Sequence, residues 1–181
     1  MKLRKSIILW AVVAAVTSCI AIDEFSPKQR TQIENYLNKN ELEYTITADS
    51  AYVHLAGNKY LEDGDERGRW AQVGSKVVFN FEAYTFASAP ATTPYYTNKR
   101  YLAEEISADL NTQYWDFEPR EVILGDGEIL SSLEDALVGS LRGDSLAVFL
   151  TSSLAYGASG MGVVPANTAV MIVLTVEDVQ E

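Results

Sequence analysis

The sequence predicts an α+β domain in which strands lie on both sides of one short helix in the C-terminal half of the chain. Residues 77–84 are rich in β-branched and aromatic side chains, as a central strand requires. Residues 131–141 carry leucines four positions apart, which is typical of one helix face, and the β-branched run 170–176 supplies a final strand. Because strands flank the helix instead of alternating with helices, the pattern is α+β and not α/β.

The start of the chain predicts a secretory signal. Basic residues precede a small and apolar run over 7–16, which is too short for a comfortable membrane span. The segment ends Val16-Thr17-Ser18-Cys19, which resembles the bacterial lipobox, in which the cysteine is acylated and becomes the first residue. An ordinary signal peptide with an incidental cysteine is the alternative. We expect residues 1–18 to be a lipoprotein signal peptide and Cys19 to hold a lipid that anchors the chain to a membrane of the bacterial cell envelope, inner or outer.

The region after Cys19 predicts an N-terminal helical extension. Ser26 is expected to be the N-cap of a helix, with Pro27 at its first position, and the helix continues to Asn38. Its apolar stripe consists of Ile33, Tyr36 and Leu37. Residues 44–47 and 52–55 are β-prone.

Composition excludes several classes of function. The net charge of -11 opposes the phosphate neutralisation on which nucleic-acid binding depends. A single cysteine and a single histidine allow no internal disulfide and no Cys/His zinc cluster. We therefore expect no nucleic-acid partner and no metal.

Other local motifs are not expected to be functional sites. Residues 157–162 are glycine-rich, but no Lys-Ser/Thr follows, so a phosphate loop is not favoured. Asp63, Asp65 and Glu66 lack the spacing of a calcium loop. His54 has no nucleophile pattern nearby and is expected on a strand face.

The segment 154–168 carries the strongest motif: Ala-Tyr-Gly, a glycine-rich loop, two branched apolar residues, a proline and a polar turn. It resembles the signature of FKBP-type peptidyl-prolyl isomerases, and residues 119–144 follow the order and spacing of the same family. With 74–83 as the first core strand, the resemblance covers about 74–179, interrupted by an insertion near 99–117. It implies a curved antiparallel sheet wrapped around a short helix, with an apolar pocket that receives a prolyl side chain.

These observations divide the chain into three parts. Residues 1–18 are the signal peptide, 19–60 the anchor and N-terminal helix and strand extension, and 61–181 the FKBP-like domain.

The resemblance also assigns site residues. Phe81 falls on a wall position that is usually tyrosine, Tyr96 on a wall position that is usually phenylalanine, and Tyr156 on the tyrosine that contacts substrate. The expected substrate pocket adds Ile129, Leu130, Leu133, Val164 and Ile172.

Some positions depart from the family. Leu133 replaces a frequent tryptophan at the pocket floor, and Ile172 replaces a frequent phenylalanine. Thr97 stands where the family has an aspartate, and Asp116 would serve instead only if the alignment shifted. The pocket is therefore expected to be apolar but less aromatic.

The implied chemistry needs no cofactor, metal or covalent intermediate. Amide resonance gives the X-Pro bond a rotation barrier of about 18–20 kcal/mol, and a desolvated site favours the twisted, less polar amide over the planar one. Tyr156 would orient the substrate carbonyl, and the backbone of Ile129 would pair with the peptide as a strand edge. The expected partners are proline-containing polypeptides and the expected function is isomerisation during the folding of exported proteins; a catalytically weak or inactive peptide-binding module is the alternative.

Overall fold

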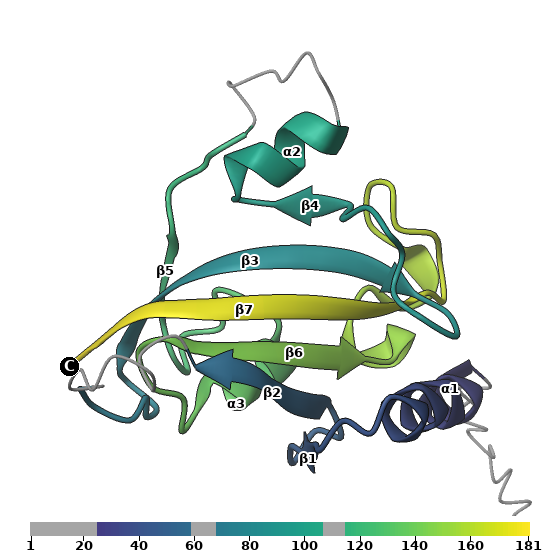
Figure 1. Cartoon of the computed structure of the whole chain (residues 1–181), viewed down its shortest axis with the longest axis horizontal. Helices are drawn as coiled ribbons and strands as arrows, with labels where there is room; N and C mark the ends of the chain where they lie inside the picture. Colours follow the sequence, from purple (N-terminus) through teal and green to yellow (C-terminus); the bar gives the residue numbers. More distant parts are fainter. Residues whose placement is uncertain (1–24, 59–67, 107–114) are drawn as a thin grey trace, which may run out of the picture.

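The computed structural model describes residues 25–58, 68–106 and 115–181 (Figure 1). A seven-stranded antiparallel sheet forms the body of the fold, in the order β1-β2-β6-β7-β3-β4, with β5 also paired to β3. The strands are β1 Thr45–Ile46, β2 Tyr52–Asn58, β3 Lys76–Phe86, β4 Tyr96–Thr97, β5 Arg120–Ile123, β6 Asp144–Leu150 and β7 Ala169–Gln180. The helices are α1 Phe25–Lys39, α2 Arg100–Ile106 and α3 Ser131–Leu137, with short 3-10 turns at Ser152–Leu154 and Gly157–Ser159. The predicted α+β class, the curved antiparallel sheet, the short helix and the N-terminal helix are all confirmed.

One face of the sheet packs against α3. Leu133 and Leu137 of α3 join Val148 of β6 and Leu174 of β7 in the main hydrophobic core. The helix ends earlier than its leucine spacing predicts: the backbone is already extended at Val138, and Gly139 has a positive φ of 84° that an α-helix does not allow. Leu141 therefore lies beyond α3, although it is buried.

The opposite face of the sheet packs against α1. Ile33 and Leu37 are fully buried in a second cluster with Phe149 of β6 and Phe86 of β3. Neighbouring residues of β6 belong to different clusters because side chains alternate across a strand: Val148 faces α3 and Phe149 faces α1. The sheet is therefore apolar on both faces.

One expectation for the N-terminal region is corrected. The helix already includes Phe25, so Ser26 lies inside it, and the Ser26 hydroxyl contacts the Ser153 hydroxyl at 2.7 Å instead of serving as the N-cap. The strand β2 pairs with β6 from Tyr52 to Asn58, so a strand of the expected extension 19–60 joins the sheet.

Some of the predicted features lie outside the described residues. These are the signal peptide 1–18, Cys19, the acidic residues 63, 65 and 66, and part of the insertion near 99–117. Within the described residues, no helix is long and apolar enough to cross a membrane. The described part of the insertion contains α2.

Candidate functional site

A groove of about 490 Å³ opens on the face of the sheet that α3 covers. Its volume is in the range of about 300–1,000 Å³ that is usual for small-molecule pockets. It is lined by Phe79, Phe81 and Ala83 of β3, Tyr96 of β4, Arg120 of β5, residues 127–130 before α3, Leu133 of α3, Tyr156 and Met161 of the loop after β6, and Ile172 and Leu174 of β7. Most of these side chains are apolar, so the groove can desolvate what enters it.

The floor follows from the pairing of β3 with β7. Phe81 lies opposite Leu174, and Ala83 lies opposite Ile172. Residues two apart on a strand face the same side, so Phe81 and Ala83 point into the groove together. Ile172 is 4% exposed and Leu174 is fully buried, which makes this floor rigid.

The entrance beside α3 is shaped by a loop that Glu134 holds. The Glu134 carboxylate accepts hydrogen bonds from the backbone N–H groups of Gly125 and Gly127, at 3.2 and 3.0 Å. Ile129 and Leu130 follow this loop at the edge of the groove, and neither of their N–H groups has a hydrogen-bond partner among the described residues. Both can therefore donate to a bound peptide.

Tyr156 lies in the long loop that joins β6 to β7. The loop is closed by hydrogen bonds between its own residues, including Asn167 N–H to the Gly157 carbonyl at 2.9 Å. Gly160 is packed so tightly that an added Cβ would lie 2.5 Å from the Val164 carbonyl oxygen. The loop can therefore hold the Tyr156 ring at a fixed place in the groove.

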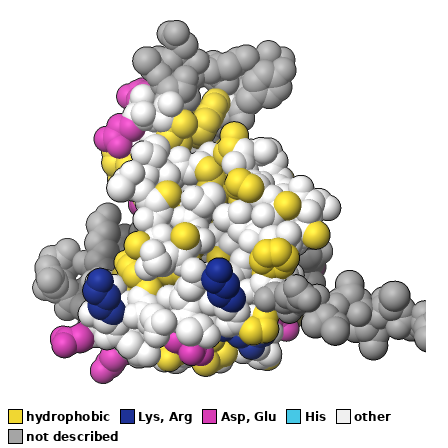
Figure 2. All heavy atoms as spheres, turned by 90° about the vertical axis from the view of Figure 1, so that its right-hand side faces the viewer, with side chains coloured by type: hydrophobic (Ala, Val, Ile, Leu, Met, Phe, Trp, Pro, Cys, Tyr) yellow, Lys and Arg dark blue, Asp and Glu magenta, His cyan; other side chains and the backbone are white. Residues whose placement is uncertain are grey.

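The helix α1 binds this loop at both ends. The Gln29 side-chain oxygen accepts hydrogen bonds from the Ser152 N–H at 2.7 Å and the Ser152 hydroxyl at 3.0 Å, and its amide donates to the Asn167 carbonyl at 2.8 Å. Figure 2 looks at this end of the molecule, where hydrophobic side chains are scattered over the surface among backbone and other side-chain atoms. The N-terminal helix is thus part of the support for the site.

The wall opposite α3 is aromatic. The Tyr96 ring lies 5.1 Å from the Phe81 ring, and Tyr96 is 44% exposed. Behind the wall, the buried Asn98 accepts a hydrogen bond from the Phe81 N–H at 2.9 Å and donates to the Asn80 side chain and the Glu118 carbonyl. The Asn98 side chain therefore connects the part of β3 that lines the groove to the residues on both sides of the insertion.

Thr97 does not face the groove. It is fully buried, its hydroxyl donates to the Phe81 carbonyl at 2.6 Å, and it accepts from the Lys99 N–H at 3.0 Å. Since Tyr96 and Thr97 are neighbours on a strand, they point to opposite sides, and only Tyr96 reaches the groove.

The predicted site residues come together with one exception. Phe81, Tyr96, Tyr156, Ile129, Leu130, Leu133 and Ile172 all line the groove. Val164 does not: it is 3% exposed in the main core, and its backbone pairs with that of Met161. The sequence analysis missed Tyr95, whose hydroxyl lies 3.0 Å from the Tyr156 hydroxyl; its place directly before Tyr96 was the only signal available.

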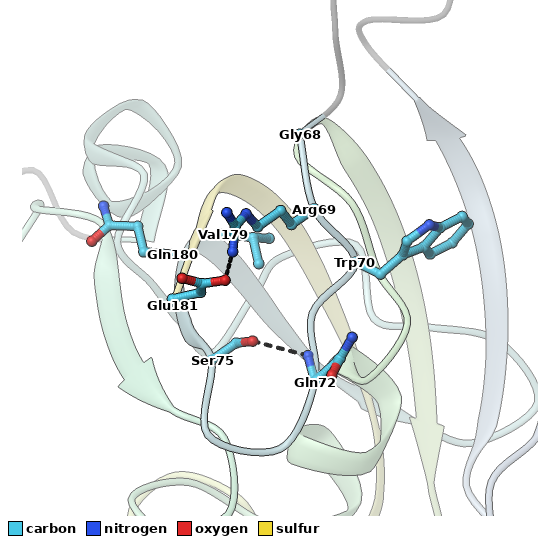
Figure 3. A pocket seen from close by; sticks show the side chains of 8 residues that line it. All are labelled: Gly68, Arg69, Trp70, Gln72, Ser75, Val179, Gln180 and Glu181. Carbon is cyan, nitrogen blue, oxygen red and sulfur yellow. Dashed lines mark hydrogen bonds and ion pairs between the residues drawn. The ribbon is translucent and has the colours of Figure 1, made fainter.

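A second hollow, of about 440 Å³, lies beside the C-terminal residue (Figure 3). An ion pair between Arg69 and Glu181 crosses it, and the Trp70 side chain points away from that pair. Trp70 and Val179 are the only large apolar side chains in its lining, so the mostly apolar groove on the α3 face is the better candidate.

Comparison with known proteins places the chain in a family. The model of the family described as FKBP-type peptidyl-prolyl cis-trans isomerase matches residues 68–177. No curated protein matches the chain.

Two solved structures share the fold. FkpA from Escherichia coli is similar at a TM-score of 0.56 with 13% identity, over 86% of this chain and 60% of that one. A peptidyl-prolyl cis-trans isomerase from Pseudomonas syringae pv. tomato is similar at 0.54 with 13% identity, over 86% of this chain and 96% of that one. The match therefore spans less than two thirds of the length of the Escherichia coli protein. The family match covers more than half of the chain and includes every residue that lines the groove, so the protein belongs to the FKBP-type peptidyl-prolyl cis-trans isomerase family.

Proposed function

We propose that this protein catalyses the cis-trans isomerisation of X-Pro bonds in the groove between β3, β7 and α3. The observation that carries the proposal is the groove itself, which has an apolar floor, an aromatic wall of Phe81 and Tyr96, and the Tyr156 ring in its lining, in a chain of this family. Such a site buries a proline ring, and it offers few polar groups to the planar amide.

The groove residues supply the chemistry. A rotating X-Pro amide loses its resonance and part of its polarity at the transition state, so a dry site stabilises that state relative to the ground state. The N–H groups of Ile129 and Leu130, which have no hydrogen-bond partner within the described part of the chain, would hold the peptide backbone at the edge of the groove. The Tyr156 hydroxyl would donate a hydrogen bond to a substrate carbonyl.

The enzymatic proposal is tested by placing a charge in the groove. Leu130→Asp puts an unpaired carboxylate where the substrate must be desolvated, so kcat/KM for a proline tetrapeptide should fall by at least about tenfold, since burying such a charge costs more than 1.4 kcal/mol. Val138→Asp, just beyond α3 and 45% exposed, is the matched control and should keep its activity. A protease-coupled isomerisation assay gives the rates, and circular dichroism must show native structure in both variants.

A peptide-binding module is the second candidate. Leu133 and Ile172 occupy positions where the family often has larger aromatic rings, so the groove is less aromatic at its floor. With a smaller contact area, the groove can still bury a proline ring. Its preference for the twisted amide over the planar amide, on which catalysis depends, is weakened more. Binding of a proline peptide by the wild-type protein without acceleration above the spontaneous rate would replace the enzymatic proposal with this one.

We further propose that the protein is a lipoprotein that assists the folding of exported polypeptides at a bacterial membrane. The support is the sequence Val16-Thr17-Ser18-Cys19 after a basic and apolar start. Each CH₂ group of an acyl chain that is buried in the bilayer stabilises membrane binding by about 0.8 kcal/mol. Several chains on one residue therefore give stable anchoring.

The lipid proposal has a direct test. Cys19→Ser removes the only thiol of the chain, so metabolic labelling with a fatty acid should fall to background and the protein should leave the membrane fraction. Ser18→Ala keeps a small residue before the cysteine and should still be labelled. Label that persists on the Cys19→Ser protein would contradict the proposal.

A further inference from the structure

The two tyrosines Tyr95 and Tyr156 meet through their hydroxyl groups at the end of the groove. The oxygens are 3.0 Å apart, and the rings contact edge-to-face with centroids 6.3 Å apart. Both rings pack against the main core, but Tyr156 lines the groove and Tyr95 does not. Tyr95 therefore reaches the groove only through the hydroxyl of Tyr156.

The hydroxyl of Tyr95 has one hydrogen-bond partner among the described residues. Among the described residues, its partner is the Tyr156 oxygen, and burial, followed by this hydrogen bond, raises the pKa of Tyr95 far above its usual value. The group is therefore a neutral donor under ordinary conditions. Tyr95 is partly buried, and a hydroxyl shielded from water that does not donate loses up to about 1–3 kcal/mol, so donation from Tyr95 to Tyr156 is the arrangement that we infer.

That arrangement leaves the proton of Tyr156 on the side of the groove. A hydroxyl carries one proton and two acceptor lone pairs, so Tyr156 can accept from Tyr95 and donate to a third group at the same time. A hydroxyl that accepts one hydrogen bond becomes a stronger donor in another, because the two bonds polarise each other.

We propose that Tyr95 is a positioning residue that aims the Tyr156 hydroxyl at the carbonyl group of the bound X-Pro peptide. The inference rests on the proposed function of the groove. Tyr95 is itself fixed to the groove floor, because its N–H donates to the Ala83 carbonyl of β3 at 2.7 Å. The backbone of β3 thus sets the direction in which Tyr156 donates.

The test is a double-mutant cycle on the full chain with a proline tetrapeptide as substrate. Tyr95→Phe keeps the ring and removes the hydroxyl, and it should lower kcat/KM by about 2- to 13-fold, the value of one neutral hydrogen bond. In a Tyr156→Phe background, the same change should cause almost no further loss, because its only route to the substrate is gone. Tyr84→Phe is the matched control: its hydroxyl donates to Glu82 at 2.5 Å and does not line the groove, so kcat/KM should not change.

The possible outcomes separate this inference from the proposed function. Equal losses from Tyr95→Phe in both backgrounds would show that Tyr95 acts through packing alone, and would overturn the inference. An increase in kcat/KM on Tyr95→Phe would also overturn it, because Tyr156 would then have been donating to Tyr95. If the wild-type protein binds peptide without turnover, the proposed function fails, and the same cycle is measured on the Kd of a fluorescent proline peptide with the same expected pattern.

Discussion

A chain that begins at residue 60 is expected to show no cooperative unfolding transition. Such a truncation removes α1 and β2, and with them the fully buried side chains of Ile33 and Leu37 and the strand that pairs with β6. The loss of each such buried side chain lowers the free energy of unfolding by about 2–5 kcal/mol, and the whole domain has a free energy of unfolding of only about 5–15 kcal/mol. The loss of the strand also leaves the edge of β6 unpaired.

Urea unfolding followed by circular dichroism measures this effect, with point variants as graded controls. Leu37→Ala should lower the free energy of unfolding by about 2–5 kcal/mol, because it leaves a cavity between α1 and the sheet. Leu55→Ala, on β2 but 55% exposed, should change it by less than about 0.5 kcal/mol. A truncated chain with the same midpoint as the full chain would show that the extension is separate from the domain, as the boundary at residue 60 implies.

The long elements could be predicted from the sequence because they carry their own signal. The strands at 77–84 and 170–176 are β-prone over many residues, and both lie in the centre of the sheet, where both faces must be apolar. The short strands β4 and β5 were not predicted, because two and four residues are too few for a periodic pattern. Their place is set by pairing with β3.

The polar supports of the site could not be predicted for a different reason. Gln29 bonds to residues 123 and 138 positions away, and nothing in its local sequence marks such partners. Asn98 is similar: it is buried and bonded to both sides of the insertion, but a lone asparagine after a threonine indicates only a turn.

Family resemblance located the groove residues but could not give the direction of each side chain. It placed Val164 in the pocket, whereas the residue points into the core. It also placed Thr97 at the position of an expected carboxylate, where the structure shows a buried hydroxyl bonded to backbone groups.

Thr97→Asp is therefore expected to destabilise the protein instead of restoring a missing catalytic group. The wild-type hydroxyl donates to the Phe81 carbonyl, and an ionised carboxylate at the same place cannot donate and repels that oxygen. An uncompensated buried charge costs about 3–5 kcal/mol, so the free energy of unfolding should fall by an amount in that range at neutral pH. Thr97→Ser keeps the donor and is the matched control, with an expected loss of about 1 kcal/mol.

The pH dependence gives the Thr97→Asp prediction a second readout. Burial raises the pKa of the new carboxyl group in the folded state above the value of about 3.9 that it has in the unfolded chain. Between the unfolded-state pKa and the folded-state pKa, the folded state binds more protons than the unfolded state. The loss in the free energy of unfolding relative to wild type should therefore shrink as the pH falls through the folded-state pKa. The protonated carboxyl group can also donate to the Phe81 carbonyl, which again restores stability at low pH. Unfolding curves of both proteins from pH 7 to pH 4 measure the difference. A Thr97→Asp protein that is as stable as wild type at pH 7 and turns over substrate faster would show that the side chain reaches the groove, and that the carboxylate was a missing part of the site.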